Sequence, residues 1–276
     1  MDGNQGPLIF VKLGGSVISD KTAPETARPD RIAQLAAEVA RAQSECPGLR
    51  LVLGHGSGSF GHVAARRYGT RQGVRGRAGW AGFAQVAAAA ARLNRLVTDE
   101  FLAAGVPVWP LQPSASARCR AGRLVALETW PLEQALAHGL VPLVYGDVAL
   151  DEEWGGTIVS TEEILAYLAR RLRPVALVLV GAVDGVFEGD PLRDPGVRRV
   201  PEIAPTTWPR VQALLGGSHG TDVTGGMLTK VEVMVALVRE HPDLVVHVIS
   251  GERPGALETV LLRPTEHVGG TIIRWE

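Results

Sequence analysis

Short runs of apolar, often β-branched residues alternate along this chain with longer segments rich in alanine and leucine. Strands are expected at 8–13, 49–53, 106–110, 141–145, 175–180 and 245–249, and helices near 29–44, 80–104, 130–138, 161–171, 207–215 and 227–240. Strands that are apolar throughout are typical of a parallel sheet buried under helices on both faces. The alternation therefore predicts an α/β fold, a three-layer αβα sandwich around a largely parallel open sheet.

Composition excludes several functional classes. The 276 residues, 46% hydrophobic and 21% charged, suit one large domain or two closely packed lobes. The formal net charge is −1 with no block of Lys or Arg, so we expect neither nucleic acid nor a membrane as partner. No apolar stretch approaches the roughly 20 residues of a membrane span. With no signal-peptide pattern and with Cys46 and Cys119 isolated, we expect a cytoplasmic protein.

Several of the expected strands end in segments rich in glycine. These segments are VKLGGS at 11–16, GHGSGSFGH at 54–62, VYGD at 144–147 and VGAVDG at 180–185. Glycine in a turn between strand and helix lets backbone N–H groups converge on an anion, although such turns also use glycine for purely structural reasons. Because the carboxyl ends of parallel strands meet at one edge, several such turns together indicate two phosphoryl groups held face to face, as in phosphoryl transfer.

Familiar nucleotide motifs are missing from the sequence. It contains no GxxxxGK[ST] and neither HRD nor DFG, so it is neither a P-loop enzyme nor a protein kinase. The stretch at 54–62 also lacks the acidic residue that follows a dinucleotide-binding loop. The only lysines are Lys12, Lys21 and Lys230, and each lies beside glycine or hydroxyl-bearing residues. These three lysines are therefore candidate phosphate ligands.

Together these motifs resemble the amino acid kinase superfamily and, within it, the isopentenyl phosphate kinases. The resemblance covers nearly the whole chain, through VKLGGSVISDK at 11–21, GHGSGSFGHVAARRYG at 54–69, YGDVALDEEWGGTIVSTEE at 145–163, VDGVF at 183–187, DP at 190–191, TDVTGGMLTK at 221–230 and GGTII at 269–273. The most discriminating part is GSFGH followed far downstream by TDVTGGMLTK. The resemblance implies an amino acid kinase-like fold and transfer of a phosphoryl group from ATP, with Mg²⁺, to isopentenyl phosphate in isoprenoid biosynthesis.

The resemblance also implies roles for individual residues. The catalytic residues would be Lys12, Lys21 and His62, with His62 closing the glycine loop and hydrogen-bonding the acceptor phosphate. The acceptor would also meet Gly56, Ser57, Ser160 and Thr161. ATP would be bound by Lys12, Gly14, Gly15, Ser16, Gly58, Asp184, Gly185, Gly226 and Lys230. No residue is assigned as a metal ligand.

Departures from the family pattern bear on this assignment. Relatives usually have glycine in place of Ser57, often Thr-Asp in place of Gly181 and Ala182, and in many cases Ser-Gly-Asp in place of 160–162.

Residues 1–173 are expected to bind the acceptor and residues 174–276 to bind ATP, within one continuous unit that forms a homodimer.

Two questions stay open at this stage. Trp80, Phe83 and Ala87 share one helical face, which either lines an apolar acceptor pocket or is plain core. The alternative functions are a fosfomycin kinase or another small-molecule kinase of the superfamily, and a non-catalytic nucleotide-binding sensor. An acceptor that is already a phosphate anion needs no strong base, so catalysis is expected to rest on positioning and charge neutralisation.

Overall fold

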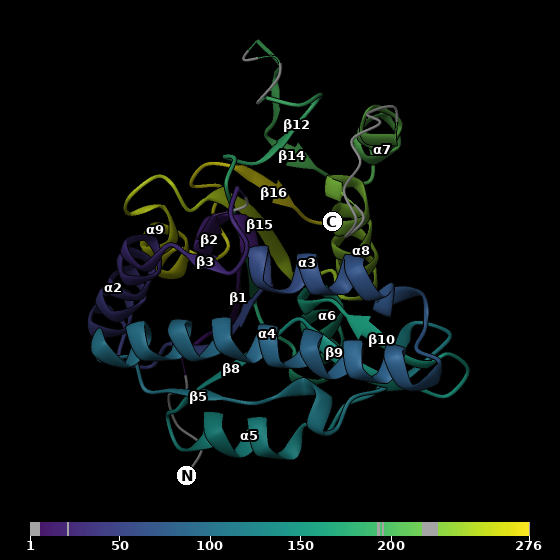
Figure 1. The fold of residues 1–276 in the computed structure, drawn as a ribbon. Helices are drawn as coiled ribbons and strands as arrows, with labels where there is room; N and C mark the ends of the chain where they lie inside the picture. The colour runs from purple at the N-terminus through teal and green to yellow at the C-terminus, as the bar shows by residue number, and fades with distance from the viewer. Residues whose placement is uncertain (1–5, 21, 192–193, 195, 217–225, 276) are drawn as a thin grey trace.

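The computed structural model describes residues 6–20, 22–191, 194, 196–216 and 226–275, and only the backbone of His62 and Val63. An eight-stranded sheet runs through the middle of the molecule in the order β14-β16-β15-β11-β1-β4-β8-β5 (Figure 1). Its strands are β1 (Leu8–Leu13), β4 (Arg50–His55), β5 (Val108–Pro110), β8 (Val141–Tyr145), β11 (Ala176–Gly181), β14 (Glu202–Ile203), β15 (Val245–Ser250) and β16 (Thr271–Ile273). Neighbouring strands are parallel except β15 and β16. The predicted largely parallel sheet is confirmed.

Successive side chains of a strand point to opposite faces, and β1 shows this in the core. Ile9, Val11 and Leu13 pack in a cluster with α2 (Pro29–Glu45), α4 (Gly76–Ala103) and α9 (Ala256–Leu262). Leu8 and Phe10 belong to the cluster on the other face. That cluster includes α5 (Trp130–Ala137), α6 (Thr161–Leu172), α7 (Trp208–Gly216) and α8 (Gly226–Glu240). Helices on both faces of the sheet make the predicted three-layer sandwich.

A second, four-stranded sheet lies beside the first and was not predicted. It has the order β10-β9-β6-β7, with β6 (Arg118–Arg120), β7 (Arg123–Ala126), β9 (Asp147–Asp151) and β10 (Gly155–Val159). Its hairpin of β9 and β10 connects β8 to α6, and β10 packs against the short 3₁₀ helix η1 (Thr70–Gln72). Two further strand pairs are β2 (Ser19–Asp20) with β3 (Thr26–Ala27) and β12 (Val186–Phe187) with β13 (Arg199–Val200).

Helices begin at the carboxyl edge of the central sheet directly after its strands. The four-residue α1 (Gly15–Ile18) follows β1, and α3 (Gly58–Tyr68) follows β4. The sequence predicts a glycine-rich loop that ends at His62. The loop is shorter than this, because α3 already begins at Gly58 and includes His62. Phe60 explains this early start, since it is 4% exposed and packs in the core cluster of α2 and α4.

No helix within the described ranges combines the length and the apolar character that crossing a bilayer requires. The longest, α4, carries several arginines and lies across the molecule in Figure 1.

Candidate active site

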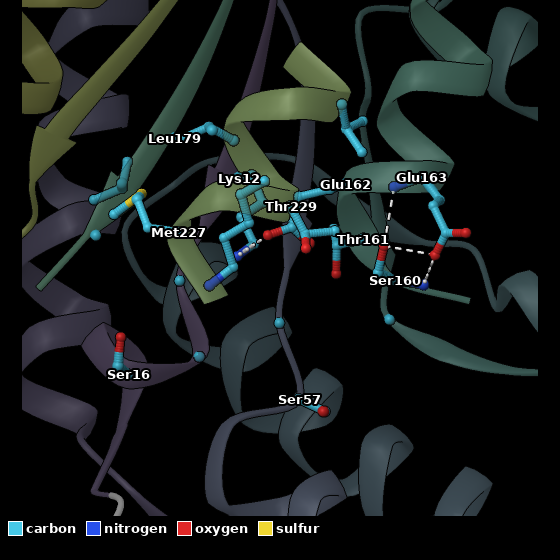
Figure 2. A pocket seen from close by; sticks show the side chains of 18 of the residues that line it. Lys12, Ser16, Ser57, Ser160, Thr161, Glu162, Glu163, Leu179, Met227 and Thr229 are labelled. Carbon is cyan, nitrogen blue, oxygen red and sulfur yellow. Dashed lines mark hydrogen bonds and ion pairs between the residues drawn. The ribbon is translucent and has the colours of Figure 1, made fainter. Parts of the chain in front are cut away.

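A cavity of about 330 Å³ opens at the carboxyl edge of the central sheet, among the starts of α1, α3, α6 and α8. Ten of the residues predicted for the site line it, namely Lys12, Gly14, Gly15, Ser16, Gly56, Ser57, Gly58, Ser160, Thr161 and Lys230. Figure 2 shows Ser16 and Ser57 on one side of this cavity and Lys12 with the start of α6 across from them. The fold thus brings together glycine-rich segments that are far apart in the sequence.

Three predicted nucleotide ligands, Asp184, Gly185 and Gly226, are not among the residues that line this cavity. From β11 and the turn after it, residues 179–183 line the cavity, and Asp184 and Gly185 follow them. One carboxylate oxygen of Asp184 accepts hydrogen bonds from Arg199 at 2.7 Å and Arg253 at 3.3 Å. The other accepts one from the backbone N–H of Ser250. Asp184 therefore ties the turn after β11 to neighbouring loops.

The remaining predicted residues divide between α8 and the undescribed positions. Gly226 begins α8 with a φ of +56°, and Lys230 lies one turn later and lines the cavity. This placement of Lys230 on the first turns of a helix agrees with its spacing from Gly226. Lys21 lies outside the described residues, and so does the side chain of His62.

Two glycines allow the loops after β1 and β4 to meet. A Cβ atom at Gly15 would lie 2.5 Å from the backbone nitrogen of Gly58. Gly58 has a φ of +49°, and a Cβ there would lie 1.9 Å from Oγ of Ser19. A larger residue at either position would force these segments apart. Gly15, Ser16 and Gly58, at the starts of α1 and α3, therefore line the same cavity.

Gly56 and Ser57 contribute differently to this loop. The N–H of Gly56 donates to the carbonyl of Leu13 at 3.0 Å, which makes it part of the sheet edge rather than a free phosphate donor. Ser57 has φ −77° and ψ −10°, a backbone conformation open to any L-residue. Serine in place of the family's usual glycine therefore causes no backbone strain here.

The start of α6 is fixed by side-chain hydrogen bonds. Ser160 and Glu163 form a capping box, in which Oγ of Ser160 accepts from N–H of Glu163 and Oε2 of Glu163 accepts from N–H of Ser160. Oγ1 of Thr161 donates to the carbonyl of His55 at 2.7 Å, which joins α6 to the end of β4. The positive end of the helix dipole is thereby held at the cavity.

An ion pair joins the first strand to this helix. Lys12 follows Leu8 and Phe10 on the face of β1 that α6 and α8 cover, and its Nζ lies 2.9 Å from Oε1 of Glu162. Burial raises the pKa of Glu162, but the charges of Lys12 and Lys230 more than offset this and leave the pKa below its usual value. With Arg71 and Glu163 also in the lining, three cationic side chains and two carboxylates give the cavity a net positive charge.

Glu162 was missing from the site predicted from the sequence, although its neighbours Ser160 and Thr161 were included. The sequence contained an indication of its role, because Glu162 is an acidic residue in the first turn of a helix that starts at the glycine-rich edge of the sheet. The sequence did not show that β1 would place Lys12 directly opposite.

A smaller cavity of about 140 Å³ adjoins the larger one. Both are lined by Ser57, Arg71, Gly146 and Ile158, which therefore mark the place where the two cavities meet. The rest of the smaller cavity is lined by Gly61, Ala65, Arg66, Gln72, Val86, Ala90 and Asp147. Beyond the junction it thus combines the small and aliphatic Gly61, Ala65, Val86 and Ala90 of α3 and α4 with three polar residues.

The question left open for Trp80 and Phe83 can be addressed from the lining of the smaller cavity. Val86 and Ala90 line it, whereas the rings of Trp80 and Phe83 contact each other with centroids 5.3 Å apart. Phe83 lies so close to β10 that a Cβ at Gly156 would come within 2.9 Å of its ring. Trp80 and Phe83 therefore hold the β9–β10 hairpin on α4.

The geometry suits a reaction between two phosphates. Lysines and the starts of helices give the larger cavity positive charge, which favours a polyanion such as a nucleoside triphosphate. The junction lies between the loop at Ser57 and the start of α6, and the smaller cavity has room for a short apolar group. A molecule with a phosphate at the junction and an apolar tail would present its phosphate to the larger cavity.

Comparisons with known proteins agree with this arrangement. The model of the amino acid kinase family matches residues 7–250. An isopentenyl phosphate kinase from Methanothermobacter thermautotrophicus is 33% identical over 96% of this chain and 98% of its own, and one from Haloferax volcanii is 35% identical over 91% and 98%. A solved isopentenyl phosphate kinase structure matches 96% of this chain and 100% of its own with a TM-score of 0.82 at 31% identity. The chain therefore belongs to the amino acid kinase family and, within it, to the isopentenyl phosphate kinases.

Proposed function

We propose that this protein transfers the γ-phosphoryl group of ATP to isopentenyl phosphate and so makes isopentenyl diphosphate for isoprenoid biosynthesis. The observation that carries the proposal is the pair of adjoining cavities, of about 330 and 140 Å³, with unlike linings. The larger suits the phosphates of a nucleotide, and the smaller suits a short apolar tail. Relatives named for this activity match the chain over nearly its whole length.

ATP is assigned to the larger cavity. Lys12, Lys230 and the amides at Gly15 and Ser16 would neutralise its phosphates, and residues 181–183 would line the nucleotide on the side of β11. Of these nucleotide contacts, Lys230 and residues 181–183 belong to the segment 174–276, and the others belong to β1 and α1. The acceptor would meet the other predicted group, Gly56, Ser57, His62, Ser160 and Thr161, all within residues 1–173.

The reaction needs little covalent help from the protein. An oxygen of the acceptor phosphate forms a bond to the γ-phosphorus while the bond from that phosphorus to the β–γ bridging oxygen breaks, which leaves ADP. The attacking oxygen is already anionic at neutral pH, so the main barrier is repulsion between two anions. Lys12 and Lys230 reduce this repulsion and fix the geometry, and Lys21 and His62 are predicted to assist at the transferred group and the acceptor.

Mg²⁺ is expected to enter the site with ATP. In the described part of the chain, no three side chains of His, Cys, Asp or Glu gather in a way that could hold a metal ion. Mg²⁺ beside a nucleotide commonly takes its ligands from phosphate oxygens and water, and it would supply further charge neutralisation. This chain's own contribution would be the lysines and amides around the phosphates.

A homodimer and a cytoplasmic location stay predictions of the family resemblance and of the sequence. Light scattering at several protein concentrations tests the first, and fractionation of the native cells tests the second. Neither is needed for the chemistry proposed above, because all the residues used come from one chain.

A panel of acceptors tests the proposed function. The purified protein is incubated with ATP, Mg²⁺ and either isopentenyl phosphate, dimethylallyl phosphate or fosfomycin, and ADP release is measured against a control without acceptor. We expect the highest kcat/KM with isopentenyl phosphate. A preference for fosfomycin would identify a fosfomycin kinase, and ATP binding without turnover of any acceptor would identify a nucleotide sensor.

A further inference from the structure

Among the side chains that the structure describes, one at the junction of the two cavities is charged. Of the four residues that line both cavities, Ser57, Gly146 and Ile158 are uncharged, and Arg71 is a permanent cation. An acceptor whose tail occupies the smaller cavity and whose phosphate reaches the larger one must place that phosphate at this junction. The position of Arg71 is thus the position where the acceptor's negative charge is expected.

Arg71 is held in place by its backbone, which leaves its side chain available. Oγ1 of the buried Thr157 on β10 donates to the carbonyl of Arg71 at 3.1 Å. With the described residues the guanidinium makes two long contacts, from Nη1 to the carbonyl of Ile158 at 3.4 Å and from Nη2 to Oε2 of Glu163 at 4.0 Å. A guanidinium has five N–H donors, so these two contacts leave most of its hydrogen-bonding capacity for a ligand.

The carboxylate near Arg71 does not compete strongly with a phosphate. Oε2 of Glu163 already accepts from the backbone N–H and the hydroxyl of Ser160 at 2.9 and 2.7 Å. At 4.0 Å, Glu163 lies near Arg71 without forming the bidentate contact that an arginine makes with a free carboxylate. The guanidinium therefore lies beside the start of α6, and the described residues use few of its donors.

We propose that Arg71 binds the phosphate of the acceptor and selects acceptors that carry a doubly charged phosphate. The proposal deepens the proposed function and rests on it for the identity of the acceptor. Arg71 donates charge-assisted hydrogen bonds to acceptor oxygens that do not attack, and so it lowers the repulsion that the incoming phosphate meets from the triphosphate.

Other arginines near Arg71 in the sequence are expected to attract the anionic acceptor over a longer range. Five arginines lie between residues 66 and 77, and no Asp or Glu occurs between 46 and 98. One of them, Arg66, also lines the smaller cavity. Positive charge at the entrance of a cavity raises the rate of encounter with anions, and salt screens this effect. The kcat/KM for the acceptor is therefore expected to fall as ionic strength rises.

Substitution of Arg71 tests the proposal against a matched control. Arg67 lies on α3 in the same basic stretch, is exposed, and stacks on the ring of Tyr68 instead of lining either cavity. We expect Arg71→Gln to raise the KM for isopentenyl phosphate about tenfold or more, which is the loss of one charge-assisted hydrogen bond. Arg71→Lys should recover part of this loss, because it keeps the charge without the planar fork.

The controls separate acceptor binding from other effects. Arg71→Gln should leave the KM for ATP within about twofold, keep the melting temperature of the wild type, and weaken the dependence of kcat/KM on salt. Arg67→Gln should leave the KM for isopentenyl phosphate within about twofold. A wild-type KM for isopentenyl phosphate in Arg71→Gln, or an equal rise in the KM for ATP, overturns the proposal and leaves the proposed function standing.

Failure of the proposed function gives a different result. If the wild type used fosfomycin instead, the same comparison of KM values on fosfomycin would decide the role of Arg71. If no acceptor were turned over, calorimetric titration with isopentenyl phosphate would decide it. Binding that weakens in Arg71→Gln but not in Arg67→Gln supports the proposal, whereas equal binding in all proteins, or no binding by the wild type, refutes it.

Discussion

Nζ of Lys12 lies 2.9 Å from Oε1 of Glu162, and the two side chains are only 9% and 10% exposed. The pair joins the first strand to a helix 150 residues later in the chain. Burying an ion pair contributes little net stability, because both charges lose their hydration. Its value here is positional, since Glu162 holds Lys12 at the cavity and also faces the charge of Lys230.

Glu162→Gln is predicted to damage both the site and the fold. It leaves the buried ammonium group of Lys12 without its carboxylate, and breaking a buried pair from one side costs about 3–5 kcal/mol. We expect a lower melting temperature and at least a tenfold fall in kcat/KM for ATP. Glu153→Gln, at an exposed position of the β9–β10 turn, serves as the control. Unchanged ATP kinetics in Glu162→Gln would remove this residue from the site.

Ala90→Leu is predicted to block the smaller cavity. Ala90 is 1% exposed and lines this cavity, whereas the neighbouring Ala87 lies on the helix face of Trp80 and Phe83. Each methylene of the acceptor that loses its buried site costs about 0.8 kcal/mol, so the KM for isopentenyl phosphate should rise several-fold or more. The KM for ATP should stay constant. Equal effects of Ala87→Leu and Ala90→Leu would show that the cavity does not hold the tail.

His62 is predicted to recognise the acceptor phosphate rather than to remove a proton, because the phosphate anion needs no deprotonation. His62→Ala should lower kcat/KM for isopentenyl phosphate about ten- to hundredfold, the usual loss for a charge-assisted hydrogen bond. His62→Gln and His62→Asn keep a donor and should recover part of the activity. If the Ala and Gln variants were equally inactive yet bound isopentenyl phosphate as tightly as the wild type, a catalytic role beyond recognition would follow.

His55 is predicted to make stability depend on pH. It is fully buried, stacks on the ring of Tyr145, and contacts Asn94 through Nε2 at 3.1 Å. Burial lowers the pKa of His55 from 6.5 to about 4. The unfolded chain therefore takes up this proton first as the pH falls, so the stability is complete above about pH 6.5 and decreases towards pH 4, by at most roughly 3 kcal/mol.

His55→Phe keeps an aromatic ring against Tyr145 and removes the titration. Urea denaturation from pH 7 to 4 should show a flatter loss of stability in this variant than in the wild type. His241 and His247, whose pKa values are also lowered by burial, act alike in both proteins, so the difference between them isolates His55. Parallel curves for the two proteins would contradict the prediction.

The central layers of the fold were predictable because their signal is local. Each of the six expected strands has a counterpart in the central sheet, since fully buried parallel strands are continuous apolar runs. In the second sheet, β6 and β7 were missed because they are short and partly exposed, and Arg118, Arg120 and Arg123 interrupt any apolar run. The edge strands β14 and β16 are only two and three residues long, too short for a pattern.

The site was predictable in part, for a similar reason. The glycines and Lys12 lie at strand ends, and a parallel sheet brings strand ends together, so their convergence follows from the fold class. Glu162 and Arg71 become functional candidates only through tertiary packing, which sets Glu162 beside Lys12 and lays Arg71 along β10. The sequence also could not show which face of α4 would line the smaller cavity.

Phosphorus NMR of a reaction with purified protein, ATP, Mg²⁺ and isopentenyl phosphate tests the central claim most directly. The account predicts that the monophosphate signal of isopentenyl phosphate is replaced by the two coupled signals of a diphosphate, with one ADP formed for each. Formation of ADP and inorganic phosphate while isopentenyl phosphate remains unchanged, or an unaltered spectrum from protein that binds ATP, would contradict it.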